Sequence, residues 1–395
     1  MNIFKDVSVS AVMAGFVTIL VGYTSAAVIV LQAAQNLGAS PVEIGSWLWA
    51  LGMGMGTTSI VLSIRYRVPI VMAWSTPGAA MLVTTTADVT MPEAIGAFLI
   101  SAGLITVLGI TGWFERLMNY LPLSLASGML AGVLLQFGLN VFTAMQAQFL
   151  MVFAMFCGYI IMRCTMPRYA VIAALILGSL IAAGQGLLEL EAVQWQWATP
   201  VFIRPEFSFN ALVGIALPLF IVTMASQNVP GVATLRAFGY SVPNSPLMSW
   251  SGIATLLLAP FGAFTINLAA ITASISMGRE AHADPGKRYI AGVTVGILYI
   301  IIGLFGATVV SVFTALPQAL VLAIAGLALI GTIGQGLLNA LTQEKEREPA
   351  LITFLVTASG VTLLGIGSAF WGLLAGILVL SIMQLSSGAS QYFNE

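Results

Sequence analysis

Four short groups of polar residues interrupt long apolar stretches of this 395-residue chain, and they are where its chemistry must lie. The groups occupy residues 22–25, 74–76, 226–228 and 265–267. Their hydroxyls and amides can hydrogen-bond, but none is a general acid or base at neutral pH. We therefore expect recognition of a ligand. The residues expected to contact it are Tyr23, Trp74, Ser75, Thr76, Gln227, Asn228, Phe264, Thr265 and Asn267.

Two of the polar groups are expected to break membrane segments into half-helices. Pro77 suits the first turn of a helix, so Ser75 or Thr76 is the expected cap of a half-helix over 77–86. A second half-helix is expected to begin near Asn267. Two amino ends aimed at one spot attract an anion, and Tyr23, Trp74 and Phe264 add flat apolar walls. This combination predicts a site for an aromatic carboxylate.

Simpler readings of the same residues stay open. Ser and Thr often bond back to their own helix in membranes. Tyr23 and Trp74 could be packing residues, and the adjacent amides Gln227 and Asn228 could merely cap a helix end. However, polar groups inside a membrane usually mark a pathway.

The composition describes a protein that crosses the membrane many times. The chain is 59% hydrophobic and 7% charged, against about 25% charged in soluble domains. Since about 20 apolar residues span a bilayer, we expect an all-α polytopic protein with about 14 segments. Their expected ranges are 10–32, 42–62, 69–86, 94–113, 122–140, 149–162, 170–185, 209–228, 246–260, 263–277, 290–310, 317–334, 350–366 and 370–386.

The placement of charges predicts the orientation. With the amino terminus in the cytoplasm, Arg204 is the only one of the 13 Lys and Arg residues that falls outside, as the positive-inside rule requires. Both termini are then cytoplasmic. The apolar run after Lys5 is too long for a signal peptide and is expected to be the first span. No Asp, Glu, Lys, Arg or His lies at the centre of an expected span, which argues against metal chemistry, hydrolysis and a carboxylate proton relay.

Fourteen segments divide into two halves of seven, and an odd number makes the second half inverted relative to the first. Weak sequence similarity supports this repeat. Leu121-Pro122 opens the fifth segment as Leu316-Pro317 opens the twelfth, and an Ala-Gly pair follows at 131–132 and at 325–326. The third and tenth segments are then partners, and they are the two broken ones, each a short strand plus a half-helix. Paired broken segments point to a transporter's binding site.

Four motifs together resemble the benzoate:proton symporter (BenE/YdcO) family over nearly the whole chain. They are Trp74-Ser-Thr-Pro-Gly-Ala-Ala, Met224-Ala-Ser-Gln-Asn-Val-Pro-Gly231, Asn267-Leu-Ala-Ala-Ile-Thr272 and Gly365-Ile-Gly-Ser-Ala-Phe-Trp-Gly372. That family is similar in architecture to nucleobase transporters and anion exchangers. One departure is Ala263-Phe264, where many members carry Gly-His.

The resemblance implies a core domain and a gate domain, with substrate between the third and tenth segments. The core would comprise residues 1–120 and 209–313, and the gate 121–187 and 314–395, with an extracytoplasmic loop at 188–208. It also implies proton-coupled benzoate transport across a bacterial inner membrane. The expected partners are an aromatic carboxylate, a proton, the lipid bilayer and a second copy of the chain, without nucleic acid or cofactor.

Alternatives remain at this point. A carrier of the same fold could move a nucleobase or an inorganic anion, although a nucleobase carrier is expected to show an acidic residue where Gln227 and Asn267 are neutral. An anion channel would need a continuous polar lining, whereas polarity here is concentrated at one depth. The coupled proton could ride on the substrate carboxyl, which we favour, or on a peripheral acid such as Asp88 or Glu93.

Overall fold

The computed structural model describes residues 5–85, 89–114, 123–189, 191, 193–270, 272–364 and 366–392. Seven of the described helices are long and apolar enough to cross a membrane, and α1 (Val9–Asn36) adds an eighth if its two parts, bent by 41°, cross together. The expected acid Asp88 and the motif residues Leu121, Pro122, Ile271 and Gly365 lie outside these ranges.

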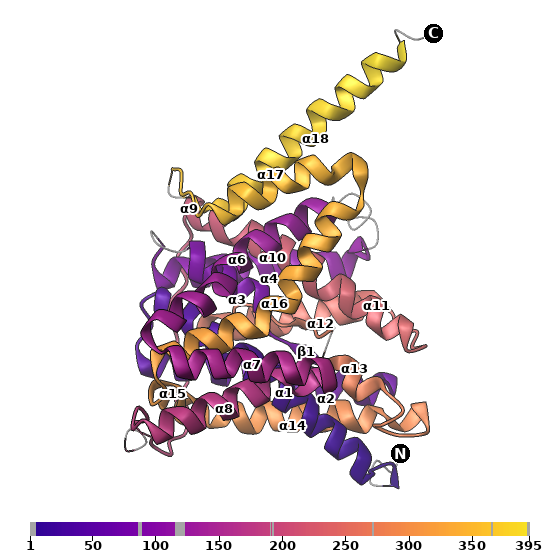
Figure 1. Cartoon of the computed structure of the whole chain (residues 1–395). Helices are drawn as coiled ribbons and strands as arrows, with labels where there is room; N and C mark the ends of the chain where they lie inside the picture. Colours follow the sequence, from indigo (N-terminus) through magenta and orange to yellow (C-terminus); the bar gives the residue numbers. More distant parts are fainter. Residues whose placement is uncertain are drawn as a thin grey trace.

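Described elements fall on each of the expected segments (Figure 1). The first half contains α1, α2 (Pro41–Tyr66), β1 (Met72–Ala73), α3 (Thr76–Thr85), α4 (Met91–Thr111), α6 (Leu123–Ala147), α7 (Phe149–Thr165) and α8 (Ala170–Gly184). The second half contains a helical run over Phe209–Ala237 (α9–α11), α12 (Asn244–Leu258), β2 (Asn267–Leu268), α13 (Ala273–Met277), α14 (Tyr289–Leu304), α15 (Gly306–Thr314), α16 (Gln318–Thr342), α17 (Arg347–Ala358) and α18 (Ser368–Tyr392).

The two broken segments meet as a two-stranded antiparallel sheet at the centre of the fold. Met72 pairs with Leu268, and Ala73 pairs with Asn267. Each strand leads into a short helix, α3 after β1 and α13 after β2. The strand-plus-half-helix form expected for the third and tenth segments is therefore confirmed. However, the second half-helix begins at Ala273, six residues later than expected, because Asn267 belongs to the strand.

The eighth segment differs from its expected range of 209–228. The helix continues through Pro230 to Ala237, and the turn before the proline, Met224–Asn228, is π-helical. Proline cannot donate the helical hydrogen bond and clashes with the preceding turn, and a wider turn at that point relieves both problems. Similarly, α17 ends at Ala358, well short of the expected 366, and the described residues 359–364 and 366–367 are not helical.

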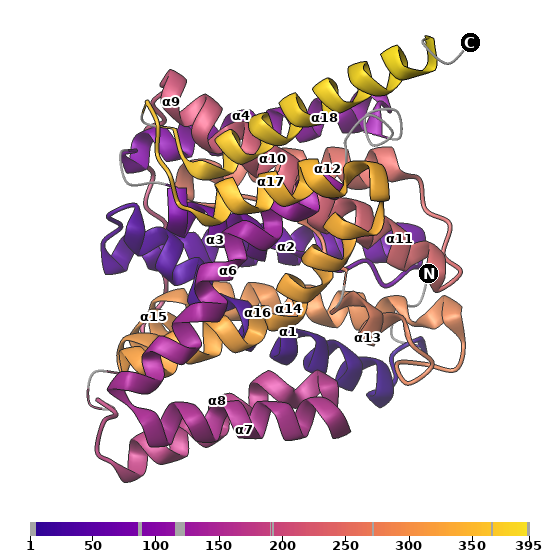
Figure 2. The ribbon, with the colours of Figure 1, turned by 45° about the horizontal axis from the view of Figure 1, so that its top comes forward.

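Helices from the two halves pack with their backbones in contact. A Cβ added to Gly52 of α2 would lie 2.6 Å from the Gly303 Cα of α14, and one on Gly56 would lie 2.6 Å from the Gly296 carbonyl oxygen. Only glycine permits such an approach. Figure 2 shows α7 and α8 at one side of the molecule, with α17 and α18 at the opposite side.

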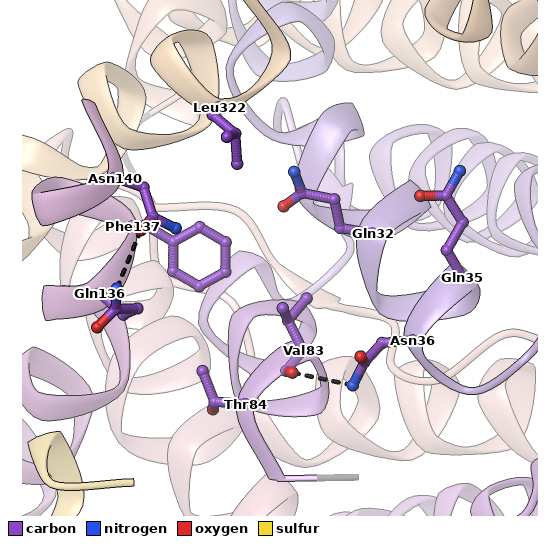
Figure 3. Close-up of a pocket in the computed structure, with 9 residues that line it drawn as sticks. All are labelled: Gln32, Gln35, Asn36, Val83, Thr84, Gln136, Phe137, Asn140 and Leu322. Carbon is purple, nitrogen blue, oxygen red and sulfur yellow. Dashed lines mark hydrogen bonds between the residues drawn. The ribbon is translucent and has the colours of Figure 1, made fainter. Parts of the chain in front are cut away.

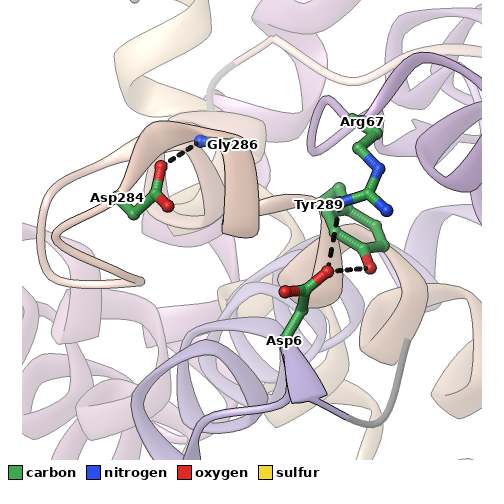
Figure 4. Close-up of polar contacts among 5 residues, drawn as sticks. All are labelled: Asp6, Arg67, Asp284, Gly286 and Tyr289. Atoms are coloured by element: carbon green, nitrogen blue, oxygen red, sulfur yellow. Dashed lines mark hydrogen bonds and ion pairs between the residues drawn. The ribbon is translucent and has the colours of Figure 1, made fainter. Parts of the chain in front are cut away.

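A polar contact at the amino end of α1 joins the two halves. The Asp6 carboxylate accepts hydrogen bonds from Arg67 Nη1 (3.1 Å) and from the Tyr289 hydroxyl (2.9 Å) (Figure 4). These bonds, with Arg67 also attracting the charge, hold the pKa of the Asp6 carboxyl below its usual value. Both ends of the chain lie toward the same end of the molecule as α11 and α13 (Figures 1 and 2).

Candidate functional site

A cavity of about 1130 Å³ runs from the two-stranded sheet to the loop after α13. Its inner part is lined by Trp74, Thr76 and Pro77 at the start of α3, by Gln227 and by Tyr299. Its mouth is lined by Arg279 and Glu280, which are both exposed. The other walls come from α1, α6, α7 and α16, so the cavity lies between helices of the expected core and gate ranges.

Aromatic rings form one wall of the inner part. The Trp74 ring packs edge-on against the Tyr23 ring, with centroids 5.0 Å apart, and its centroid lies 6.5 Å from that of Tyr299. Trp74 is 5% exposed, and that small exposed part faces the cavity. Tyr299 was not foreseen, because it lies in the uninterrupted apolar run of α14.

The amino end of α3 meets the cavity beside this wall. Ser75 is the cap, since the Gly78 N–H donates to Ser75 Oγ (3.0 Å). The Ser75 N–H in turn donates to Thr265 Oγ1 (3.2 Å), which ties the start of α3 to the chain before β2. Ser75 is fully buried and works as the cap, whereas Thr76 and Pro77 reach the cavity. The positive end of a helix dipole is therefore presented next to an aromatic wall.

The two adjacent amides have different surroundings. Gln227 lines the cavity. Asn228 is fully buried, and its Oδ1 accepts the Leu268 N–H (3.1 Å), so it holds β2 against the helical run. Its Nδ2 donates to Met224 Sδ (3.2 Å). Neither amide is at a helix end, since the helix continues to Ala237.

Three other expected contact residues lie behind the cavity lining. Thr265 and Asn267 are buried in the sheet crossing, and the buried Asn267 Oδ1 has no hydrogen-bond partner among the described residues. Phe264 is fully buried between Trp47 and Phe98, with ring centroids 6.0 and 6.2 Å away, and it does not line the cavity. Of the three aromatic residues expected to form the walls of the site, Tyr23 and Trp74 pack together, whereas Phe264 lies elsewhere.

Arg163, a positively charged residue of the expected gate range, lines the cavity. Arg163 on α7 donates to the Tyr159 hydroxyl (2.6 Å) and passes over α16 at Gly331, where an added Cβ would lie 3.3 Å from its Nη1. The sequence places Arg163 simply at a helix end, with no signal that it faces a cavity. The acid Glu93 instead caps α4, accepting the Thr90 N–H (2.9 Å) and hydroxyl (2.8 Å).

A second, smaller cavity of about 360 Å³ lies at the other end of α3 (Figure 3). Val83 and Thr84 at the carboxyl end of α3 line it, together with residues of α1, α6 and Leu322 of α16. No charged side chain is among its described lining residues. The two cavities therefore meet α3 at its opposite ends.

Comparison with known proteins agrees with this architecture. A family model described as benzoate membrane transport protein (BenE) matches residues 5–382. The chain belongs to the BenE family. Two relatives of this BenE-family protein are the Escherichia coli K12 "Inner membrane protein YdcO", 47% identical over 96% of this chain and 97% of that one, and the Acinetobacter baylyi "Benzoate membrane transport protein", 41% identical over 96% of each.

Solved structures show that the BenE-family chain has the fold of anion transporters. SLC26A9 matches with a TM-score of 0.66 at 13% identity, over 95% of this chain and 66% of the other. The transmembrane domain of the cyanobacterial bicarbonate transporter BicA matches with a TM-score of 0.59 at 13% identity, over 93% and 97%. At 13% sequence identity the similarity shows only a shared fold, which consists of two inverted repeats. The family is one of membrane transport proteins, and enzymatic activity is not part of it.

Proposed function

We propose that this chain is a secondary active transporter of a small aromatic carboxylate, with benzoate as the first candidate. The observation that carries the proposal is the inner end of the large cavity, where the Trp74 ring adjoins the amino end of α3. An aromatic ring would pack against Trp74, and its carboxylate would face the helix amino end and the Gln227 amide. A relative named as a benzoate transport protein supports this choice.

We further propose that the proton travels on the substrate carboxyl. Within the described residues, the inner part of the cavity has no carboxylate or imidazole, and Glu280 lies at the mouth. Glu93 is occupied as a helix cap, and the other peripheral acid, Asp88, lies outside the described residues. The carrier that we favour is therefore still the substrate carboxyl. A carboxylate facing a helix amino end is favoured when ionised, so its protonation would weaken binding and assist release.

Movement is proposed to follow alternating access between the core and gate ranges. The large cavity lies at the end of the fold that carries Arg163 and Arg279, which the distribution of basic residues assigns to the cytoplasm. The small cavity at the other end of α3 would then face outward. The membrane would be a bacterial inner membrane with both termini in the cytoplasm, and a homodimer is the proposed assembly.

Uptake into proteoliposomes tests this function. Radiolabelled benzoate should accumulate when the trapped interior is made alkaline, and unlabelled benzoate should compete while acetate and uracil do not. Glu93→Gln should keep the response to the pH gradient. Loss of that response with exchange retained would place the proton on Glu93, and absence of benzoate uptake by the wild-type protein would reject the substrate.

An inorganic anion is the second candidate, because the fold matches SLC26A9 and BicA. The same liposomes distinguish the two substrates. Sulfate or bicarbonate uptake that benzoate does not inhibit would favour the inorganic anion. Such a carrier would have no need of the Trp74 ring.

A further inference from the structure

Two matched pairs of amide side chains lie on the long helices α6 and α16. Gln136 Nε2 donates to Asn140 Oδ1 (2.9 Å), and Gln335 Nε2 donates to Asn339 Oδ1 (2.8 Å). Each pair has a Gln followed four residues later by an Asn, on one face of a 25-residue helix. Gln136 and Asn140 end the expected span 122–140, and Gln335 and Asn339 follow the expected span 317–334, so each pair lies where a span ends.

The pairs lie at different levels of the two-helix unit, with Gln136–Asn140 just past the middle of α6 and Gln335–Asn339 near the carboxyl end of α16. A Cβ added to Gly326 would meet the Phe137 carbonyl, and one added to Gly336 would meet Ser127 and Ala131, so α6 and α16 run antiparallel. Gln335–Asn339 is therefore displaced from Gln136–Asn140 by about 16 Å along the helix axes. One pair lines the small cavity, and the other lines the large cavity. Each end of the expected pathway thus has one pair.

Within each pair the unused groups favour an anion. The single internal bond occupies one Gln N–H and the Asn oxygen, which leaves three N–H donors, one from Gln and two from Asn, against one acceptor, the Gln oxygen. The internal bond also keeps the two amides oriented while the cavity is empty. In the small cavity, the Gln32 side chain of α1 approaches the same space from the side opposite to Gln136 and Asn140 (Figure 3).

We propose that the two Gln-x-x-x-Asn pairs are entry and exit sites for the carboxylate, one at each end of the transport pathway. This inference rests on the proposed carboxylate transport and adds two binding sites on the gate range to the central one. At the small cavity, whose described lining carries no charged side chain, neutral amide donors would bind an anion without the tight hold of a fixed charge. At the large cavity the Arg163 guanidinium, which lies over Gly331 one helical turn from Gln335, would add a positive charge to the amides. An anion that stops briefly at a pair can then move on toward Trp74 or leave the protein.

Transport measured from each side tests the proposal. Benzoate uptake is compared in intact cells and in inverted membrane vesicles for the double variants Q136L/N140L and Q335L/N339L. Q136L/N140L should raise the apparent KM several-fold in cells and leave it unchanged in inverted vesicles. Q335L/N339L should do the reverse. Vmax should be unchanged at saturating benzoate, because the central site is intact.

Matched variants separate binding from folding. The exchanged pair Q136N/N140Q keeps every donor and should keep the wild-type KM. Gln146→Leu on α6 and Gln318→Leu on α16 remove exposed amides that line neither cavity, and they should have no effect. An unchanged KM in both double variants, or equal rises on both sides, would overturn the proposal. If wild-type protein moves no benzoate, the proposed substrate fails instead, which the wild-type measurement alone reveals.

Discussion

The two broken segments began as equivalent parts of a repeat, yet they now differ in length, capping and surroundings. The helix α3 has ten residues and is capped by Ser75, whereas α13 has five and its Thr272 makes no capping bond. Trp74 follows β1 as Ala269 follows β2. In the second segment, β2 is held by Asn228, and α13 is held by a hydrogen bond between Thr18 and Ser276 (2.8 Å).

This difference indicates a division of labour between the halves. The first broken segment presents an aromatic ring and a capped helix amino end to the cavity. The second is fixed from behind by side chains of α1 and of the π-helical turn. Because the two halves differ in this way, the ring and the helix amino end that face the cavity come from one half only. Such an unequal site would suit the proposed substrate, which has a ring at one end and a carboxylate at the other.

The largest expected effect is at the ring. Trp74→Ala should weaken benzoate binding about 10- to 100-fold, because an aromatic contact of about 1.4–2.7 kcal/mol is lost. Ala269→Ser, at the equivalent place in the second half, should change binding little. Titration calorimetry on purified protein measures both, with the exposed Trp197→Ala as a control. Equal losses at the two positions would break the proposed division.

The adjacent amides should separate into a ligand contact and a support. Asn228→Ala leaves the buried Leu268 N–H without its acceptor, so it should lower the free energy of unfolding by about 1–3 kcal/mol. Gln227→Ala should leave stability within about 0.5 kcal/mol of wild type and weaken binding. Thermal unfolding and benzoate binding of both variants measure this. A stable Asn228→Ala protein that binds no benzoate would make Asn228 a contact residue.

A smaller difference is expected between the two helix starts. Ser75→Ala removes the cap of α3 and should cost about 1 kcal/mol of stability. Thr272→Ala removes no capping bond and should change stability by less than about 0.5 kcal/mol. Comparison of thermal midpoints in one detergent checks the contrast. A larger loss at Thr272 would mean that α13 depends on a contact of that side chain other than a cap.

The smallest effect is expected at Asp6, where both halves meet. Its lowered pKa means that the charged carboxylate stabilises the fold above the usual carboxyl pKa, and that this contribution is lost as pH falls through the lowered value. Asp6→Asn should therefore lower the thermal midpoint slightly at neutral pH, and the difference should vanish in acid. A difference that grows as the pH falls would contradict this assignment.

Much of this arrangement could be predicted from the sequence because its signals are local. Pro77 after Ser75 and Thr76 marks a helix start in any context, and the structure has that helix with Ser75 as its cap. Residue pairing across the repeat identified the second broken segment. Of the expected contact residues, Trp74, Thr76 and Gln227 line the cavity, and Tyr23 packs on Trp74.

The other features of the fold and the site could not be predicted because they depend on tertiary structure. The eighth segment was expected to end at residue 228, but the helix continues from a π-helical turn through Pro230 to Ala237. Asn267 and the adjoining Phe264 were expected at the site because they belong to or border a polar group of the sequence. Both are fully buried and neither lines the cavity, and Asn267 pairs with Ala73 in the sheet. Arg163 and Tyr299 reach the cavity only because α7 and α14 are rotated to face it, and neither has a sequence signal of that rotation.

The glycine contacts between α2 and α14 also have a consequence for biosynthesis. Gly52 and Gly56 complete their packing only against Gly303 and Gly296, and α14 begins at Tyr289, long after α2 ends at Tyr66. During synthesis from the amino terminus, α2 is therefore made long before the helix that its glycine face packs against. The close packing of α2 is therefore completed only once α14 of the second half has been made.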